Sequence, residues 1–463
     1  MNAIIFSALI GVVMMLGGIV IKNNASIQSL AIILLFILLG SHLAEYYNLF
    51  NIHIETHGML AKNRFGMFFN TIIISLTLLY VLLSGDEIAK AGTYGAEYFA
   101  LLFFSLCGAT ILSSYNNLLM LFLGVEIMTI PLFVLTASEK KNLKSNEAGL
   151  KYFLMGSFST GILLMGIALY YGGTGLFAIE AGIGKNANEI QQTLRILLPL
   201  GLLFIFISLA FKVSAAPFHF WTPDVYDGAP SVFTSFMATI VKTAGFIAFI
   251  RLFELRSVDM SYSWKILLPL IIILTLLAGN ITAVFQQSVK RMLAYSSIAH
   301  AGFMLFALYN PNDFGKQGIL LYTVAYSLAT IGTFAVLTKM KDYTYEGYNG
   351  LAKSKPVLAA TNTIFLLSLA GIPLTAGFFA KYYMLASALK ESTRNLWLVI
   401  VAVLFAAVSV YYYFRVIQAM YFKEGNAETT EIKPFFKVLL IIIAALIIVI
   451  GLMPSLLLDL FYA

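Results

Sequence analysis

A lysine, a proline and a histidine interrupt one apolar stretch that is long enough to cross a membrane. The stretch begins near Ile196, and it contains Lys212 and Pro217 before it reaches His219. A lysine at the centre of a hydrocarbon span costs roughly 3 kcal/mol on insertion scales, and a proline inside a helix costs about 3 kcal/mol in water. The spacing of seven places Lys212 and His219 on nearly the same helix face. We therefore predict a broken helix whose cations are satisfied inside a helix bundle.

One carboxylate, Glu126, lies in the middle of the apolar segment LMLFLGVEIMTIPLFVL. A lone carboxylate at membrane depth either takes up a proton or finds a cation, and both outcomes suit a proton carrier. A Glu–Lys pair at about 4 Å and an effective dielectric of about 20 is worth about 4 kcal/mol. We expect Glu126 to modulate Lys212 in this way. The alternative is a carboxylate that only holds two helices together.

Four further ionisable residues lie in or next to other apolar segments: Lys151, Lys242, His300 and Lys381. Lys151 opens a segment with several hydroxyl side chains, although its position alone also fits the positive cluster of the preceding loop. Two charged lysines in consecutive helices repel by about 2 kcal/mol at roughly 8 Å and an effective dielectric of about 20. We therefore expect at least one of Lys212 and Lys242 to lose its proton more readily than usual or to lie near an anion. His300 follows two serines and a tyrosine, groups that both donate and accept protons. A satisfied interior histidine is the alternative for His300.

The composition places these residues in a membrane. The 463 residues are 60% hydrophobic and 11% charged, and the mean hydropathy is +0.88. Apolar stretches of about twenty residues, enough to cross the bilayer as a helix, recur along the chain. The sequence predicts an all-α polytopic membrane protein with about 14 transmembrane helices. The net charge of +7 is scattered through short loops, so we expect no nucleic-acid partner.

The sequence also predicts no cofactor and no metal in this chain. Its one cysteine, Cys107, cannot supply the four ligands that an iron–sulfur cluster normally takes. His53 and His57 could bind a metal on a helix, but an external loop fits their polar surroundings better. His42 and Glu45 lie near the end of the second apolar segment, where we expect them to be solvated at the membrane interface.

Two parts of the chain match at a shift of about 170 residues. Tyr152, Ser157 and Thr160 fall on Tyr322, Ser327 and Thr330, and Lys212 falls close to Lys381. Two consecutive units of five spans must have opposite orientation, so we predict inverted repeats with broken helices seven and twelve, interrupted at Pro217 and Pro373. The predicted organisation is a three-helix segment (1–95), a first repeat (96–255), a second repeat with helix thirteen (256–420) and a C-terminal helix (421–463).

The loops give an expected orientation. Loops after odd-numbered segments carry somewhat more Lys and Arg than loops after even-numbered segments. Lys290 and Lys339 are counted in the first set of loops, and Arg251 is counted in the second. Positive loops favour the cytoplasmic side. We therefore expect both termini on the non-cytoplasmic side of the membrane.

The segment AFKVSAAPFHFWTPDVYDGAPSVFTSF resembles the most distinctive motif of the antiporter-like subunit N of proton-pumping NADH:quinone oxidoreductase, respiratory complex I. The resemblance runs from about Leu101 to the C-terminus and includes KRMLAYSSI. Related L and M subunits and multi-subunit antiporters share the proline, histidine and tryptophan but usually lack VYDGAP. Where the family commonly has two consecutive prolines, this chain has Pro373 and Leu374, which leaves the geometry of that break open.

The resemblance implies a non-redox subunit of this enzyme in a bacterial-type inner membrane, with other membrane subunits, including antiporter-like ones, and lipid as partners. It places Lys151 inside the polar pathway. Our hypothesis is that Glu126 modulates Lys212, that His219 or Lys242 passes the proton toward the centre, and that His300 carries it on to Lys381. The resemblance implies the same order, driven by quinone reduction elsewhere in the complex. The alternatives are a subunit of a multi-subunit cation/proton antiporter and a structural membrane subunit.

Overall fold

The computed structural model describes residues 1–91, 95–179, 192–255, 262–309, 312–391 and 393–462. The described residues are almost entirely helical, with isolated β-bridges and no strand among them. Among these residues, twelve helices are long and apolar enough to cross a membrane, and two shorter apolar helices, Leu197–Lys212 and Pro356–Ala370, precede the two breaks. The all-α polytopic fold is confirmed, whereas the number of fourteen spans stays a prediction.

The chain divides into two compact units, of which the first comprises Met1–Val213 and Ile240–Asp259. Asparagine side chains at the N-caps of four of its helices accept a backbone N–H, which satisfies donors that a helix start leaves free. The helices of this unit are α1 (Asn2–Val20), α2 (Asn24–Tyr46), α3 (Arg64–Lys90), α4 (Gly95–Leu112), α5 (Leu118–Thr136), α6 (Leu143–Thr174), α7 (Gln192–Lys212) and α10 (Lys242–Leu255).

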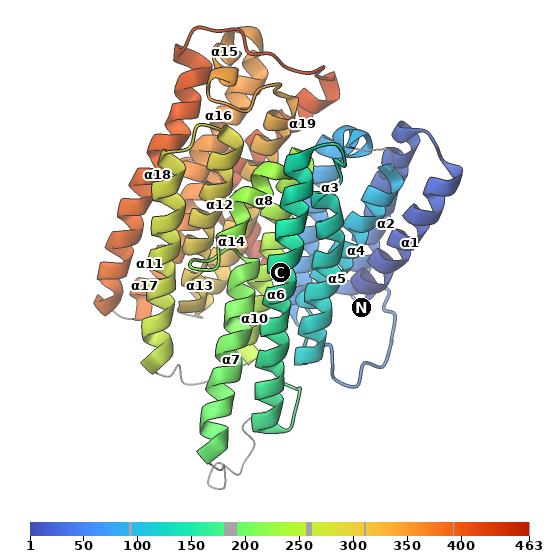
Figure 1. The fold of residues 1–463 in the computed structure, drawn as a ribbon, viewed down its shortest axis with the longest axis vertical. Coiled ribbons are helices and arrows are strands. Elements are labelled where there is room, and N and C mark those ends of the chain that lie inside the picture. The colour runs from blue at the N-terminus through green and yellow to red at the C-terminus, as the bar shows by residue number, and fades with distance from the viewer. Residues whose placement is uncertain (92–94, 180–191, 256–261, 310–311, 392, 463) are drawn as a thin grey trace. The chain divides into compact units, whose positions relative to one another are not determined.

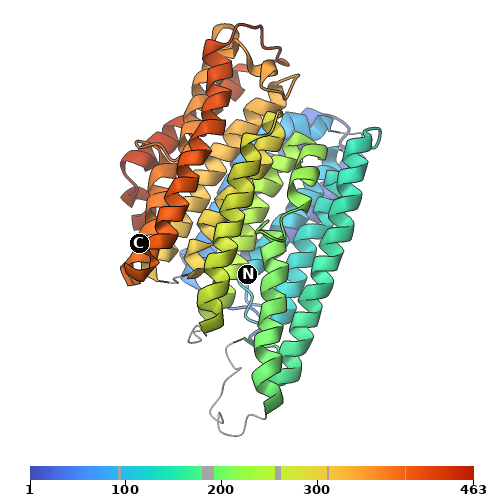
Figure 2. The same cartoon turned by 60° about the vertical axis from the view of Figure 1, so that its left-hand side comes forward.

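Small residues let the helices that carry the candidate residues approach each other. Figures 1 and 2 show α6 and α7 side by side. A Cβ atom at Gly166 would lie 2.8 Å from the carbonyl oxygen of Gly201, and one at Gly201 would lie 2.8 Å from that of Gly166. Helices that pack in a membrane commonly use glycine for such contacts. The two backbones therefore touch, and the polar side chains of α6 and α7 are brought within hydrogen-bond reach.

The second unit comprises Ser214–Thr239 and Met260–Ala463. Helix α14 forms its core, because the apolar window of this helix is wholly buried, and α14 packs on α16, α17 and α19. The helices of this unit are α8 (Trp221–Gly228), α9 (Ser231–Phe236), α11 (Tyr262–Val284), α12 (Val289–Met304), α13 (Phe306–Tyr309), α14 (Asp313–Lys339), η2 (Glu346–Tyr348), α15 (Leu351–Ser354), α16 (Pro356–Ala370), α17 (Ala376–Glu391), η3 (Thr393–Asn395), α18 (Leu396–Phe422), α19 (Pro434–Leu452) and α20 (Ser455–Tyr462). A π-helical turn, η1 (Met237–Val241), directly precedes α10.

A break is present at each of the two predicted places. Helix α7 ends at Lys212, and the chain then turns through a cis Ala216–Pro217 peptide bond before α8 begins. Helix α16 ends at Ala370, and α17 begins at Ala376. Each break contains one non-glycine residue with positive φ: Ser214 (+65°) in the first and Leu374 (+73°) in the second. Such residues cost of order 1–3 kcal/mol.

The conformation of Leu374 gives a testable consequence. Its φ is +73°. Proline cannot adopt this angle, because its ring fixes φ near −65°. A second proline at this position therefore requires a different backbone conformation. We expect Leu374→Pro to destabilise the fold by about 2 kcal/mol or more, and Leu374→Gly to keep or raise stability, because glycine adopts positive φ without strain. The midpoint of thermal inactivation of the purified complex measures both effects. An unchanged midpoint for the proline variant would show that the strain is absent.

Candidate functional site

The carboxylate of Glu126 lies in the first unit, where it is only partly exposed on α5. The hydroxyl of Thr160 on α6 donates a hydrogen bond of 2.7 Å to Glu126 Oε1. Thr160 itself is nearly buried, at 9% exposure. A hydroxyl beside a carboxylate can donate to its ionised form and accept from its protonated form, so this pair can accommodate both states of Glu126.

A second hydroxyl pair joins α6 to α7. Ser159 directly precedes Thr160 in the chain, and its Oγ lies 3.1 Å from Ser208 Oγ. Both serines are 1% exposed. Ser208 precedes Lys212 by four residues, so the two side chains share one face of α7. Two separate hydrogen bonds, from Thr160 to Glu126 and between Ser159 and Ser208, thus lie between the helix of Glu126 and the helix of Lys212. We refer to these three hydroxyls as the polar ladder.

Lys212 is the last residue of α7, and it is 7% exposed. Its Nζ has no hydrogen-bond partner among the described residues, and the Phe211 ring lies 5.9 Å away. The carboxylate of Glu126 supplies the negative charge that acts on this ammonium. Burying an ammonium without a direct acceptor is costly.

Lys242 begins α10 and is 1% exposed. Its helix approaches the end of α7, since a Cβ at Gly245 would lie 2.9 Å from a methyl group of Val213. The hydroxyl of Thr243, next to Lys242, is buried and has no hydrogen-bond partner in the part of the chain that the structure describes. The π-helical turn η1 directly before Lys242 is a feature that often marks functional sites. The structure thus brings α10, which begins with Lys242, close to the end of α7, where Lys212 lies.

Lys151 is half-exposed, unlike the buried residues Ser159 and Thr160 of the same helix, α6. Its Nζ is 2.7 Å from Glu147 Oε1, and the two side chains are 41% and 63% exposed. Residues four apart on a helix form such pairs readily. Within this chain Lys151 is therefore a half-exposed member of an ion pair, and the buried pathway that the resemblance implies for it stays a prediction.

His219 lies in the second unit, in the turn between α7 and α8. Its ring centroid is 4.5 Å from that of Phe220, which is 70% exposed, and its Nδ1 has no hydrogen-bond partner among the described residues. The prediction that Lys212 and His219 share one helix face is wrong, because α7 ends at Lys212 and the chain turns before it reaches His219.

Both ring nitrogens of His300 on α12 have a hydrogen-bond partner. Its Nδ1 lies 2.7 Å from the hydroxyl of Tyr322, and its Nε2 lies 3.1 Å from the hydroxyl of Tyr413. Tyr413 also contacts Ser296 Oγ at 2.5 Å. In a neutral imidazole one nitrogen donates and the other accepts, so exchanging the two tautomers reverses the direction of the whole hydrogen-bonded chain. This arrangement can relay a proton without moving the ring.

Lys381 on α17 lies across the second break, which contains Pro373. Its Nζ donates hydrogen bonds to the carbonyl oxygens of Leu369, at 3.0 Å, and Ala370, at 2.8 Å. The ring of Phe303 lies 5.1 Å from this ammonium. Since Phe303 follows His300 by less than one helical turn on α12, the structure brings Lys381 and His300 to the same part of the second unit.

Tyr413 and Ser208 are functional candidates that sequence reasoning missed. Tyr413 lies 113 positions from His300 in the sequence, and only folding reveals the contact. The signal for Ser208 was present, because a serine four residues before a buried lysine shares its helix face.

Three basic residues that entered the orientation count as loop residues lie buried within helices, so that prediction is wrong for them. Arg251 donates to the carbonyl oxygens of Ser114 and Tyr115. Lys290 donates to those of Asp227 and Ala229, at 2.8 and 2.6 Å. Lys339 lies 5.2 Å from the Phe436 ring. Backbone carbonyls and rings satisfy these cations, which a hydropathy count does not register.

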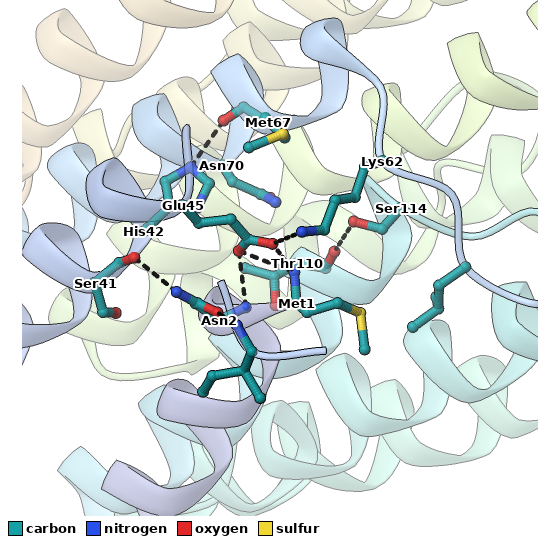
Figure 3. A network of polar contacts seen from close by, with 12 residues as sticks. Met1, Asn2, Ser41, His42, Glu45, Lys62, Met67, Asn70, Thr110 and Ser114 are labelled. Atoms are coloured by element: carbon teal, nitrogen blue, oxygen red, sulfur yellow. Dashed lines mark hydrogen bonds and ion pairs between the residues drawn. The ribbon is translucent and has the colours of Figure 1, made fainter. Parts of the chain in front are cut away.

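A second polar cluster lies at the end of α2, where Figure 3 shows three groups converging on Glu45. Lys62 Nζ lies 2.6 Å from Glu45 Oε1, and the α-amino group of Met1 and the backbone N–H of Asn2 bind the same carboxylate. Burial lowers the pKa of the Met1 amine, and Glu45 opposes this effect. Glu45 and His42 are 2% and 1% exposed, so the expectation of an interfacial, solvated position is wrong.

Within the described part of the chain, no group of three or more His, Cys, Asp or Glu residues is placed to hold a metal ion. His57 and its neighbour Glu55 are 75% and 85% exposed in the loop after α2. The absence of a cofactor from this chain stays an expectation.

The geometry defines a class of protein. Two interrupted helices, each with a buried lysine at or beside the break, lie in an all-helical bundle of membrane-length segments. Buried ionisable residues and paired broken helices are typical of membrane proteins that move ions.

Comparisons with known proteins identify the family. Residues 115–409 match the family model described as NADH:quinone oxidoreductase/Mrp antiporter, TM. A protein named NADH-quinone oxidoreductase subunit N from Cytophaga hutchinsonii is 40% identical, with 99% of each chain covered. Another of that name from Flavobacterium psychrophilum is 37% identical over 99% of this chain and 100% of that one. The chain belongs to the NADH:quinone oxidoreductase/Mrp antiporter family, and the resemblance to subunit N is confirmed.

Solved structures show the same fold. A chain of respiratory complex I from Thermus thermophilus matches with a TM-score of 0.83 and 30% identity, covering 99% of this chain and 98% of that one. A chain of the Mrp complex from Dietzia matches with a TM-score of 0.82 over 98% and 95% of the two chains. The identity to the Dietzia chain is 19%, so this second likeness concerns the fold alone.

Proposed function

We propose that this chain is a proton-translocating membrane subunit of an NADH:quinone oxidoreductase, driven by quinone reduction elsewhere in the complex. The likeness to subunit N over the whole chain supports this assignment, and so does the likeness to a chain of respiratory complex I. Other membrane subunits of the complex, antiporter-like ones among them, and lipid are its proposed partners. The chain itself carries no redox centre and no cofactor in this proposal.

The observation that carries the proposal is the polar ladder of the first unit. Glu126 binds Thr160, Ser159 binds Ser208, and Ser208 shares a helix face with Lys212, whose buried Nζ lacks a hydrogen-bond partner among the described residues. Lys290, by contrast, donates to two backbone carbonyls. Lys212 instead experiences the charge of Glu126, which suits a group that gains and loses a proton.

The chemistry of one transfer follows from these groups. With Glu126 ionised, its charge favours the ammonium form of Lys212, which then holds a proton. When Glu126 is protonated or its charge is compensated, desolvation favours the neutral amine, and Lys212 Nζ releases a proton to the next acceptor. Hydroxyl groups can pass a proton because each one donates and accepts at the same time.

The proposed order continues through both units. His219 or Lys242 receives the proton from Lys212, His300 carries it on, and Lys381 lies near the exit. The contacts of His300 with Tyr322 and Tyr413 support its role as a relay. Lys151 remains in the proposal as a residue inside the polar pathway, as the resemblance implies.

The proposed organisation is an inverted repeat with the boundaries given above and with both termini on the non-cytoplasmic side. One parallel supports the repeat. In the first unit a side chain of α6, Thr160, binds the ionisable residue of α5, and in the second unit a side chain of α14, Tyr322, binds that of α12. Thr160 and Tyr322 lie in the two segments that match at a shift of about 170 residues.

A cation/proton antiporter subunit is the alternative, which the comparisons do not favour, because the likeness to the Mrp chain from Dietzia concerns the fold alone. The two functions differ in what drives transport. In proteoliposomes that contain the purified complex, we expect NADH oxidation in sodium-free buffer to acidify the interior where the complex is inserted to pump inward. Transport that needs sodium or an imposed pH gradient, without a response to NADH, would instead favour the antiporter.

A further inference from the structure

At the second break, a lysine side chain of α17 donates hydrogen bonds to the last carbonyl groups of α16. The last carbonyl groups of a helix lack partners within the helix. At the end of α16, the carbonyl of Leu367 accepts from the backbone N–H of Gly371. The carbonyls of Leu369 and Ala370 accept from Lys381 Nζ, at 3.0 and 2.8 Å. The ammonium thus lies at the negative end of the helix dipole.

Gly371 leaves the space in which this lysine lies. The residue is the C-cap of α16 and has a φ of +82°. A Cβ atom built on Gly371 would lie 2.8 Å from Cδ, 3.2 Å from Nζ and 3.3 Å from Cε of Lys381. A side chain at this position would therefore force the end of the Lys381 side chain to shift from where it lies.

We infer that Gly371 is a positioning residue for Lys381: the missing side chain lets the lysine cross the break and set its ammonium on the carbonyl oxygens of Leu369 and Ala370. The inference rests on the proposed role of Lys381 as a proton carrier near the exit. The two carbonyls stabilise the ammonium form more strongly than the neutral amine, because hydrogen bonds from a charged donor are the stronger ones. Gly371 thereby sets how firmly Lys381 holds its proton.

A glycine at a helix C-cap is common for backbone reasons alone, and the chain supplies a control for this alternative. Gly175 is the C-cap of α6, with a φ of +71°. A Cβ atom at Gly175 would meet no heavy atom within 4 Å. Alanine at either position imposes a similar backbone strain, but only alanine at position 371 would displace a lysine.

The experiment compares Gly371→Ala, Gly175→Ala and Lys381→Met in the complete complex reconstituted into proteoliposomes. We expect Gly175→Ala to pump as the unmodified complex does. We expect Gly371→Ala to release about tenfold fewer protons per NADH, as for loss of a positioned acid–base group. We also expect its pumping to become half-maximal about one pH unit lower, because the ammonium has lost its two acceptors.

Each outcome separates this inference from the proposed function. Normal pumping by Lys381→Met would contradict the role of Lys381 itself. Loss of pumping in Lys381→Met, together with normal pumping and an unchanged pH profile in Gly371→Ala, would overturn the inference alone. If Gly371→Ala does not assemble, Gly371→Ala combined with Lys381→Ala tests the clash directly. Restored assembly in the double variant supports the inference, and continued failure contradicts it.

Discussion

The Lys212→Met variant is expected to assemble normally and to lose most of its proton pumping. Methionine has nearly the length and flexibility of lysine and is apolar, so the buried site at the end of α7 accepts it. It removes the amine that holds the proton in this proposal. Loss of a positioned acid–base group typically costs a factor of about 10² or more, and we therefore expect at least about a tenfold fall in protons released per NADH oxidised.

The measurement uses proteoliposomes that contain the purified complex, with a pH-sensitive dye inside and NADH oxidation followed in parallel. Lys341→Met is a suitable control, because Lys341 is 59% exposed and pairs with the exposed Glu428. The control is expected to pump normally. Normal pumping by Lys212→Met itself, with the complex intact, would remove Lys212 from the pathway.

The second large effect is expected from Glu126→Gln. Glutamine keeps the shape of the side chain and an oxygen that accepts from Thr160, but it removes the charge that acts on Lys212. Two unit charges roughly 8 Å apart at an effective dielectric of about 20 interact by about 2 kcal/mol. Loss of this interaction corresponds to a factor of about 30 in a protonation equilibrium. We expect proton release per NADH to fall by about tenfold.

The matched control is Glu424→Gln, which alters an exposed carboxylate in the loop after α18. It should leave pumping unchanged. Equal pumping by Glu126→Gln and the unmodified complex would mean that Lys212 responds to no charge from Glu126, and that the carboxylate only holds α5 against α6.

Much of the architecture followed from patterns that physics constrains tightly. A lysine and a proline in an apolar segment of membrane length predicted a break at Pro217, and the small residues around Pro373 predicted the second break. Both breaks are present. Burial of Lys212 and Lys381 followed from the same argument, since neither has a membrane interface nearby in the sequence.

The partners of those side chains did not follow, because they come from distant parts of the chain or from the backbone. The two carbonyl acceptors of Lys381 exist only because α16 ends at Ala370. Helical periodicity also gave a wrong prediction for Lys212 and His219. The two residues do not share a helix face, because α7 ends at Lys212. The matched lysines lie 169 positions apart, but the two prolines lie 156 apart, so Lys212 precedes its break and Lys381 follows its own.

The most direct test of the central claim is proton release per NADH by the Lys212→Arg variant. Arginine keeps a positive charge at the end of α7, but it does not lose its proton in proteins. If Lys212 works by gaining and losing a proton, the arginine variant assembles and pumps as poorly as Lys212→Met. If it pumps as the unmodified complex does, a fixed cation suffices at this position, and the account of Lys212 as a proton carrier is contradicted.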